Sequence, residues 1–337
     1  MSQGAGRSLH ATSADPAAGL PPGGKCNVST NSTFPLQTAP PQEEGQAPSP
    51  GTGENSAGLQ LTLVTLEKEI QQLPALSVIV SEVLALIDRG DVELTVLMQK
   101  IGQDQALTAR VLRVVNSPFY GFSRHIGSLK DAGMMLGVHT LRNIVMAAGI
   151  MGHFPPGEDR DFDRLSFWQH AIGTGVATRV LAGHCGLDEE TAFSAGLLHD
   201  IGKLVMAVYF PADFDQVLAW RDEQDCLLKD AEQAVLGFDH SLVGARVAQK
   251  WKLPEAIIEA IQHHHVPDSV ADIPFATLVH VADILCRGLE IGHGGDTLMP
   301  TLDVAAMQRV GLDWEALRTA LPEIEALNTG TNLMAIE

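Results

Sequence analysis

From Leu59 onward, apolar residues recur at the spacing of an α-helix, and no sustained stretch alternates apolar and polar residues as a half-buried strand would. This helical spacing extends from Leu76 to Asp88 and continues through Leu94–Ile101 and Leu107–Val115. Aromatic residues make up only 5% of the chain, so aliphatic side chains must supply most of the packing. That composition is typical of helix bundles. The sequence therefore predicts an all-α fold.

Segments rich in helix-breaking residues divide the chain. Residues 1–58 are rich in Gly, Pro, Ser and Thr and bury too little apolar surface to offset the entropy of ordering, so we expect a disordered leader. The polar joint Pro155–Asp159 divides the remainder. We expect one helical subdomain over 59–157, a larger one over 158–295 and a helical extension over 296–337.

Two local signals predict helix boundaries. Ser128-Leu-Lys-Asp131 resembles a capping box, with Asp in place of the preferred Glu, and predicts that a helix begins there. Gly137 is expected to separate that helix from another that runs from about His139 to Met151.

Charge and cysteine content restrict the partners and the compartment. The formal net charge of −19 disfavours nucleic acid as a partner, because neutralising phosphates requires Lys and Arg. It would also repel an anionic substrate unless bound metal ions reversed the local field. The four cysteines have no Cys-x-x-Cys spacing, which favours a reducing cytoplasm over a disulfide framework. No apolar run is long enough to span a bilayer, so we expect a cytoplasmic protein without a membrane partner.

The pair His199-Asp200, within Gly196–Lys203, is the main candidate for a chemical site. Adjacent side chains on a helix lie about 100° apart, so both can lean toward one ion. Imidazole and carboxylate together suit Zn, Mn or Fe. Further His and Asp residues fall on predicted helices or helix ends: His170, His240, His264, His265 and Asp283. Helix bundles build metal sites in this way, each helix projecting one or two ligands inward.

Each candidate also has a purely structural interpretation. The His199-Asp200 pair could cap a helix end, and His264–His265 could lie solvated at a helix C-terminus, where the dipole favours cations. His170 could be a satisfied core histidine and His240 a helix-start residue without a ligand role. Asp283 is harder to explain structurally, because a lone carboxylate in an apolar helix needs a partner. Burying these polar groups unpaired is costly, which favours a metal.

Several separated motifs resemble one known family, the HDOD domain, an HD-related output domain of bacterial signalling. The motifs are Leu73-Pro-Ala-Leu, Arg113-Val-Val-Asn-Ser-Pro-Phe-Tyr-Gly121, Leu141-Arg-Asn143, Gly196–Lys203, Trp251-Lys-Leu-Pro254 and Ala260–Pro267. The resemblance covers roughly residues 66–290. It implies membership of the HD superfamily of metal-dependent phosphohydrolases, with an HD-like fold for the C-terminal subdomain.

The resemblance implies two divalent transition-metal ions, Fe, Mn or Zn, bridged by the Asp200 carboxylate. The ligands implied for the first ion are His170, His199, Asp200 and Asp283, and those implied for the second are His240, His264 and His265 beside the bridge. Lys203 would contact a substrate phosphate, which makes Asp200 and Lys203 the candidate catalytic residues.

Two departures from the related HD-GYP phosphodiesterases bear on activity. The loop after His265 contains no Gly-Tyr-Pro, which in those enzymes helps to recognise the cyclic dinucleotide. This argues against hydrolysis of cyclic di-GMP. Ser166 stands where some of those enzymes carry a carboxylate, so a third metal is not expected.

Two functions from different classes follow. The favoured one is a signalling output module that binds a signalling protein or a small phosphorylated ligand without turnover. The alternative is a metal-dependent phosphohydrolase acting on a nucleotide or another phosphoester. The first measurement that distinguishes these two functions is the metal content of the purified protein. The sequence fixes neither the substrate nor the oligomeric state.

Overall fold

The computed structural model describes residues 61–85, 93–116, 122–154, 162–269, 272–296 and 298–328, and every regular element in these ranges is helical. The predicted all-α fold is therefore confirmed. The expected leader over 1–58 and the joint Pro155–Asp159 lie outside the described residues. Residues 56–337 form one compact unit, to which all of the described residues belong.

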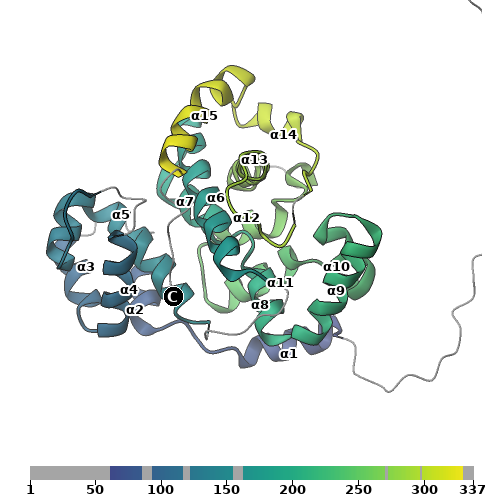
Figure 1. Cartoon of the computed structure of the whole chain (residues 1–337), viewed down its shortest axis with the longest axis horizontal. Coiled ribbons are helices and arrows are strands. Elements are labelled where there is room, and N and C mark those ends of the chain that lie inside the picture. Colours follow the sequence, from purple (N-terminus) through teal and green to yellow (C-terminus); the bar gives the residue numbers. More distant parts are fainter. Residues whose placement is uncertain are drawn as a thin grey trace, which may run out of the picture. The chain divides into compact units, whose positions relative to one another are not determined.

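Figure 1 labels most of the elements of this unit. In chain order they are α1 (Leu63–Gln72), α2 (Val78–Ala85), α3 (Leu94–Ile101), α4 (Gln105–Val115), α5 (Leu129–Met151), α6 (Arg164–Cys185), α7 (Glu189–Leu198), α8 (Ile201–Tyr209), α9 (Pro211–Gln224), α10 (Leu228–Leu236), α11 (His240–Lys250), α12 (Glu255–His263), the 3-10 turn η3 (Pro267–Ser269), α13 (Pro274–Gly288), α14 (Val304–Arg309) and α15 (Trp314–Asn328).

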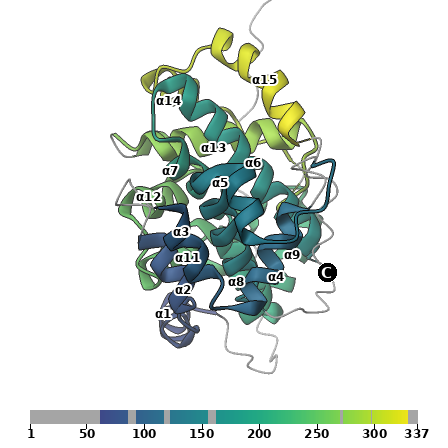
Figure 2. The ribbon, with the colours of Figure 1, turned by 90° about the vertical axis from the view of Figure 1, so that its left-hand side faces the viewer.

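Helix α5 is the scaffold of the N-terminal group, because α2, α3 and α4 all pack on it. This group lies at the left of Figure 1 and toward the viewer in Figure 2. The Ser128 hydroxyl accepts the Asp131 N–H and donates to the Asp131 carboxylate, so the predicted cap is confirmed. Gly137, at φ +79°, interrupts the helical backbone of α5, as the sequence predicted.

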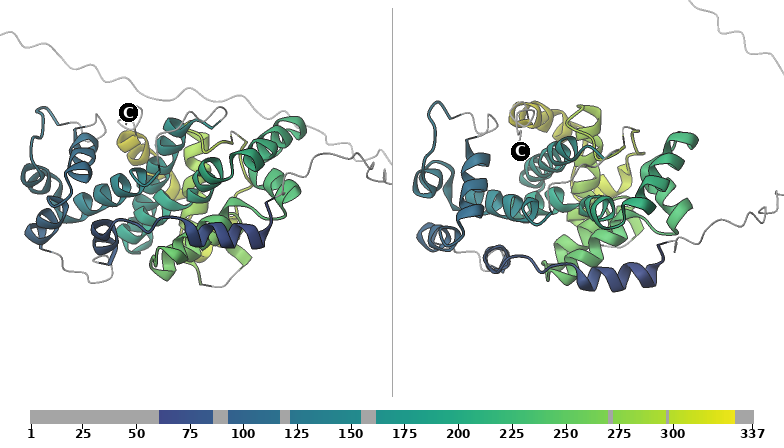
Figure 3. Two further views of the ribbon diagram at one scale, coloured as in Figure 1. Left: turned by 90° about the horizontal axis from the view of Figure 1, so that it is seen from below. Right: turned by 60° about the horizontal axis from the view of Figure 1, so that its bottom comes forward.

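Helix α6 is the centre of the larger group and packs against α7, α13 and α15. Gly196 permits the close contact of α7 with α6, because a Cβ there would lie 2.5 Å from Thr178 Oγ1. Helices α11 and α12 complete the group, and α1 lies along α11, seen in Figure 3 as the dark blue helix beside the green ones. This packing brings the ends of α7, α8, α11 and α12 together.

One apolar core runs through both groups of helices. It contains Val83, Val111 and Leu141 from the N-terminal group together with Leu204 and Ile261 from the larger group. A second core joins α6 and α13 to α14 and α15. The division into subdomains at residue 157 stays a prediction, and the first core is continuous across it.

Within the described ranges, no single helix has both the length and the apolar character needed to cross a membrane. Two sharply bent helix pairs pass that test only when each pair is taken together: Leu129–Val138 with Thr140–Met151, and Glu189–Tyr209 with Pro211–Gln224.

Candidate metal centre

The predicted metal ligands all lie close to one another inside the larger group of helices. Their positions are α6 for His170, the α7–α8 junction for His199 and Asp200, the start of α11 for His240, the end of α12 for His264 and His265, and α13 for Asp283. Two sets of three residues each have their ligand atoms within 4.8 Å of one another. The first set is His170, His199 and Asp200, and the second is His240, His264 and His265. These sets contain three of the four ligands predicted for the first ion, all but Asp283, and the three histidines predicted for the second. Metal binding itself stays a prediction.

The Asp200 carboxylate lies between the two sets. Its Oδ1 is 3.1 Å from His240 Nε2 and 3.7 Å from His264 Nε2. Its Oδ2 is 3.2 Å from His199 Nε2 and 4.0 Å from His170 Nε2. One oxygen thus faces each set, which is the geometry that a carboxylate bridging two ions requires.

Asp283 completes the first set from α13. Its Oδ1 lies 2.9 Å from His170 Nε2 and 4.0 Å from His199 Nε2. The same oxygen accepts a hydrogen bond of 2.9 Å from Arg287 Nε. Burial raises the pKa of Asp283, but Arg287 and His170 outweigh that effect and hold the pKa well below its usual range. Asp283 is therefore an ionised oxygen donor.

Several buried polar atoms at the centre have no hydrogen-bond partner, and this fits a metal site. They include both ring nitrogens of His170, Nε2 of His199, Nε2 of His264 and Oδ1 of Asp200. A buried polar atom without a partner costs about 1–3 kcal/mol, and here several such atoms point to the same place. Imidazole nitrogen and carboxylate oxygen are donors that Zn, Mn and Fe accept. The residues present therefore fit the implied ions.

Backbone carbonyls fix the tautomers of two of the histidines. His199 Nδ1 lies 2.7 Å from the Gly196 carbonyl and His264 Nδ1 lies 2.8 Å from the Ile261 carbonyl. A carbonyl only accepts, so each Nδ1 must carry the proton and donate. In the neutral form of each ring, Nε2 then carries the lone pair with which an imidazole binds a metal.

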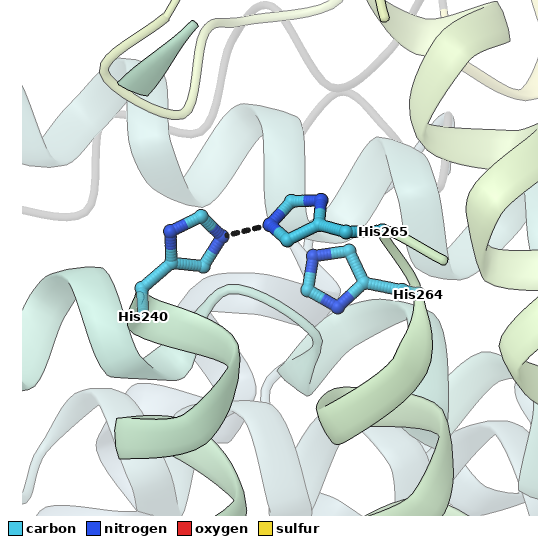
Figure 4. Close-up of side chains that lie close together, drawn as sticks. All are labelled: His240, His264 and His265. Atoms are coloured by element: carbon cyan, nitrogen blue, oxygen red, sulfur yellow. Dashed lines mark hydrogen bonds between the residues drawn. The ribbon is translucent and has the colours of Figure 1, made fainter. Parts of the chain in front are cut away.

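Figure 4 shows how His240, His264 and His265 face one another. His265 Nε2 lies 2.8 Å from His240 Nε2, and the rings of His264 and His265 are 3.9 Å apart. Burial, reinforced by His199, lowers the pKa of His264 to about 3. Burial and the adjacent His264 hold the pKa of His265 well below its usual value. Both rings are thus neutral at neutral pH, the state in which imidazole binds a metal.

Glu232 of α10 is a residue of the site that sequence analysis missed. Its Oε2 accepts the backbone N–H of His240 at 2.9 Å and lies 2.6 Å from His240 Nδ1. Burial lowers the pKa of His240, but the Glu232 carboxylate outweighs it, and the pKa is raised to about 9. A carboxylate behind a metal-binding imidazole fixes the orientation and the tautomer of the ring.

Lys203, the predicted phosphate contact, is fully buried on α8. Its Nζ donates to Asp200 Oδ2 at 2.7 Å, so in this structure the ammonium pairs with the predicted bridging carboxylate. Burial raises the pKa of Asp200, but His199 and Lys203 outweigh it and hold the pKa well below its usual range. The role of Lys203 toward a phosphate stays a prediction.

A glycine-rich loop, Gly292–Asp296, covers the first set of ligands. A Cβ on Gly294 would lie 2.7 Å from Asp200 Oδ2 and 3.1 Å from Lys203 Nζ, so a residue without a side chain permits this approach. The backbone N–H of His293 donates to Ser166 Oγ at 2.8 Å. Ser166, at which no third metal was expected, thus anchors the loop over the centre.

Replacing Glu232 with Gln is expected to weaken metal binding about tenfold, because the carboxylate that orients His240 becomes a neutral amide. Asp230→Asn removes a carboxylate from an exposed position on the same helix and should leave the affinity unchanged. Calorimetric titration of the metal-free proteins with Zn²⁺ measures both. Equal affinities for the two variants would exclude Glu232 from the site.

Comparison with known proteins agrees with this architecture. Residues 73–267, more than half of the chain, match the family model of the HDOD domain. The chain belongs to the HDOD family. The crystal structure of an HDOD domain protein with unknown function from Geobacter sulfurreducens is 27% identical, with a TM-score of 0.68 over 80% of this chain and 97% of that one. A Shewanella amazonensis protein, described as a candidate phosphohydrolase, is 25% identical with a TM-score of 0.64, over 79% of this chain and 96% of that one.

The curated relatives of this HDOD protein are longer chains. An uncharacterised protein of Treponema pallidum is 26% identical over 230 residues, which are 67% of this chain and 44% of the relative. A ribonuclease Y of Thermus thermophilus is 29% identical over 184 residues, which are 52% of this chain and 27% of that enzyme. The chain therefore spans less than half the length of these relatives. The predicted membership of the HDOD family, within the HD superfamily, is confirmed.

Proposed function

We propose that this HDOD protein is a bacterial signalling output module that holds two divalent metal ions and acts by binding a protein or a small phosphorylated ligand. The observation that carries the proposal is the closure of the site. His199 and Lys203 are 0% exposed, and Asp200 is 1% exposed. Gly294 lies directly against Asp200 and Lys203. On the side that Gly294 covers, a centre of this kind can retain ions but leaves a phosphoester no direct approach to Asp200 Oδ2. On the other side, His265 is partly exposed and leaves the second set accessible to a ligand.

The outer side of the covering loop supports the same proposal. A cavity of about 330 Å³ there is lined by Gly295 and Asp296 of the loop and by the carboxylates of Asp163, Asp222 and Asp225. Although Arg221 also lines it, carboxylates predominate. A phosphate group approaching the centre from this side would be repelled, whereas a divalent cation would be attracted. This disfavours a phosphoester substrate that enters here, and a phosphorylated ligand of the module would bind at another face.

The second candidate function is a metal-dependent phosphohydrolase acting on a nucleotide or another phosphoester. The buried ion pair of Lys203 with Asp200 favours it, since both groups would flank a phosphate bound at the ions. The names of two relatives, a candidate phosphohydrolase and a ribonuclease, point the same way. Bound ions would stabilise the charge on such a phosphate. The loop Gly292–Asp296 would first have to move away from Asp200.

Metal content and turnover together test the proposal. We expect about two equivalents of transition metal per chain after purification, and no hydrolysis of bis(4-nitrophenyl) phosphate. His199→Ala is expected to lower the metal content to about half, because the first ion loses one of its four ligands. His125→Ala, at an exposed histidine away from the site, is the matched control.

The other outcomes separate the two candidates. Hydrolysis that disappears in both Asp200→Asn and Lys203→Met would establish the phosphohydrolase and overturn the proposal. A wild-type protein without transition metal, together with a His199→Ala variant of unchanged stability, would contradict both functions.

A further inference from the structure

A cavity of about 580 Å³ lies away from the metal centre, among α5, α6, α7 and α15. Its lining includes Asn143 from α5, Val176 and Val180 from α6, Phe193 from α7 and the exposed Glu323 from α15. The volume is within the range of about 300–1,000 Å³ that is usual for small-molecule sites. None of the predicted metal ligands lines it.

Asn143 gives this cavity a polar group that is ready for a ligand. It belongs to the family motif Leu141-Arg-Asn143, which the metal centre does not use. The side chain is 3% exposed, and its Nδ2 donates to the Glu190 carboxylate. A carboxylate only accepts, so this bond fixes the orientation of the amide. Oδ1 is thereby left buried without a hydrogen-bond partner, and a donor on an occupant would satisfy it.

The charges around the cavity leave an excess of carboxylate. Glu190 lies 3.6 Å from Arg142 and 3.7 Å from Arg179, and Arg179 also donates to Glu189 at 3.2 Å. These two carboxylates and two guanidinium groups balance one another. Glu323 adds a further carboxylate to the lining, which also contains His184. The cavity therefore favours a cation over an anion.

We propose that this cavity binds a small organic cation, an amine with an apolar body. The ammonium group would donate to Asn143 Oδ1 and be balanced by Glu323. The hydrocarbon would pack against Val176 and Val180, and the Phe193 ring adds an aromatic surface that attracts cations. The buried acceptor selects for a donor, the apolar walls select for a hydrocarbon, and the excess carboxylate selects for positive charge.

Two helices that line the cavity also carry residues of the metal centre. Val176 and His170 lie on the same helix, α6, and Phe193 lies on α7, which ends next to His199. An amine bound here contacts both helices that carry ligands of the first ion. Amine binding itself requires no metal, so it can be tested whether or not the metal centre is occupied.

The test is a calorimetric titration of the full chain with 2-phenylethylamine and with 2-phenylethanol, a neutral molecule of nearly the same shape. We expect saturable binding of the amine and at least about tenfold weaker binding of the alcohol, the ratio that 1.4 kcal/mol represents. Glu323→Gln should weaken amine binding several-fold. Glu255→Gln, which removes an exposed carboxylate from α12, should leave it unchanged.

A second variant tests the location. Gly183 is exposed at the edge of the cavity, where a Cβ would meet only the flexible Glu189 side chain at 3.4 Å. Gly183→Trp should therefore fold, which its melting temperature checks, and abolish amine binding by filling the cavity. The proposal is overturned if the amine does not bind at about 10 mM, if amine and alcohol bind equally, or if folded Gly183→Trp binds the amine as the wild type does.

Discussion

Gly202→Ala is expected to destabilise the fold by about 3 kcal/mol or more and to reduce metal binding, although alanine normally stabilises a helix. Gly202 is buried near the start of α8, where α11 crosses it. A Cβ there would lie 2.0 Å from the His240 carbonyl oxygen and 2.8 Å from Gly244 N. Both are backbone atoms, so no side-chain rotation relieves the overlap. The start of α11 must shift, and His240 shifts with it.

Urea unfolding and Zn²⁺ titration of the same samples measure both effects of Gly202→Ala. The matched control is Gly183→Ala, an exposed helical glycine whose added Cβ makes only an ordinary contact at 3.4 Å. That variant should be stabilised by about 0.4–1 kcal/mol, because alanine restricts the unfolded chain. Equal stability of Gly202→Ala and the wild type would mean that the α8–α11 contact does not hold the site together.

The helices were predictable because the buried face of an amphipathic helix produces apolar residues at a helical repeat in the sequence itself. Leu94–Ile101 was predicted with the bounds observed for α3. The interval from Leu76 to Asp88 contains α2, which begins only at Val78 because the Ser77 hydroxyl accepts the N–H of Val80. Ser77 is a residue type that commonly caps helices. The prediction used apolar spacing alone and therefore placed the start of this helix two residues too early.

The candidate metal ligands, which the structure brings together, were predictable from residue type and from the family motifs. The residues that support them were not. Glu232 lies in α10, where the sequence gives no sign that it is buried behind His240. Gly294 contacts Asp200, more than ninety positions earlier in the chain. The first contact crosses the short turn between α10 and α11, and the second places a loop against the start of α8. Neither follows the helical repeat, so no local pattern records them.

Removing Asp200 is expected to abolish binding of both ions and to destabilise the fold. The side chain offers one oxygen to each set of ligands, so Asp200→Ala removes a donor from both. It also leaves the fully buried ammonium of Lys203 without its carboxylate. Breaking a buried ion pair by removing one partner costs about 3–5 kcal/mol, because the other charge is left uncompensated.

A second substitution separates these two effects. In Asp200→Ala/Lys203→Met the stranded charge is gone, so most of the lost stability should return in urea unfolding while the metal content stays near zero. Lys203→Met alone should keep its metal, because Asp200 retains its histidine neighbours. If the single Asp200 variant and the double variant were equally unstable, the cost would lie in the loss of the ions rather than in the stranded ammonium. In that case the metal centre itself, and not the ion pair of Asp200 with Lys203, would stabilise the packing of α7, α8 and α11.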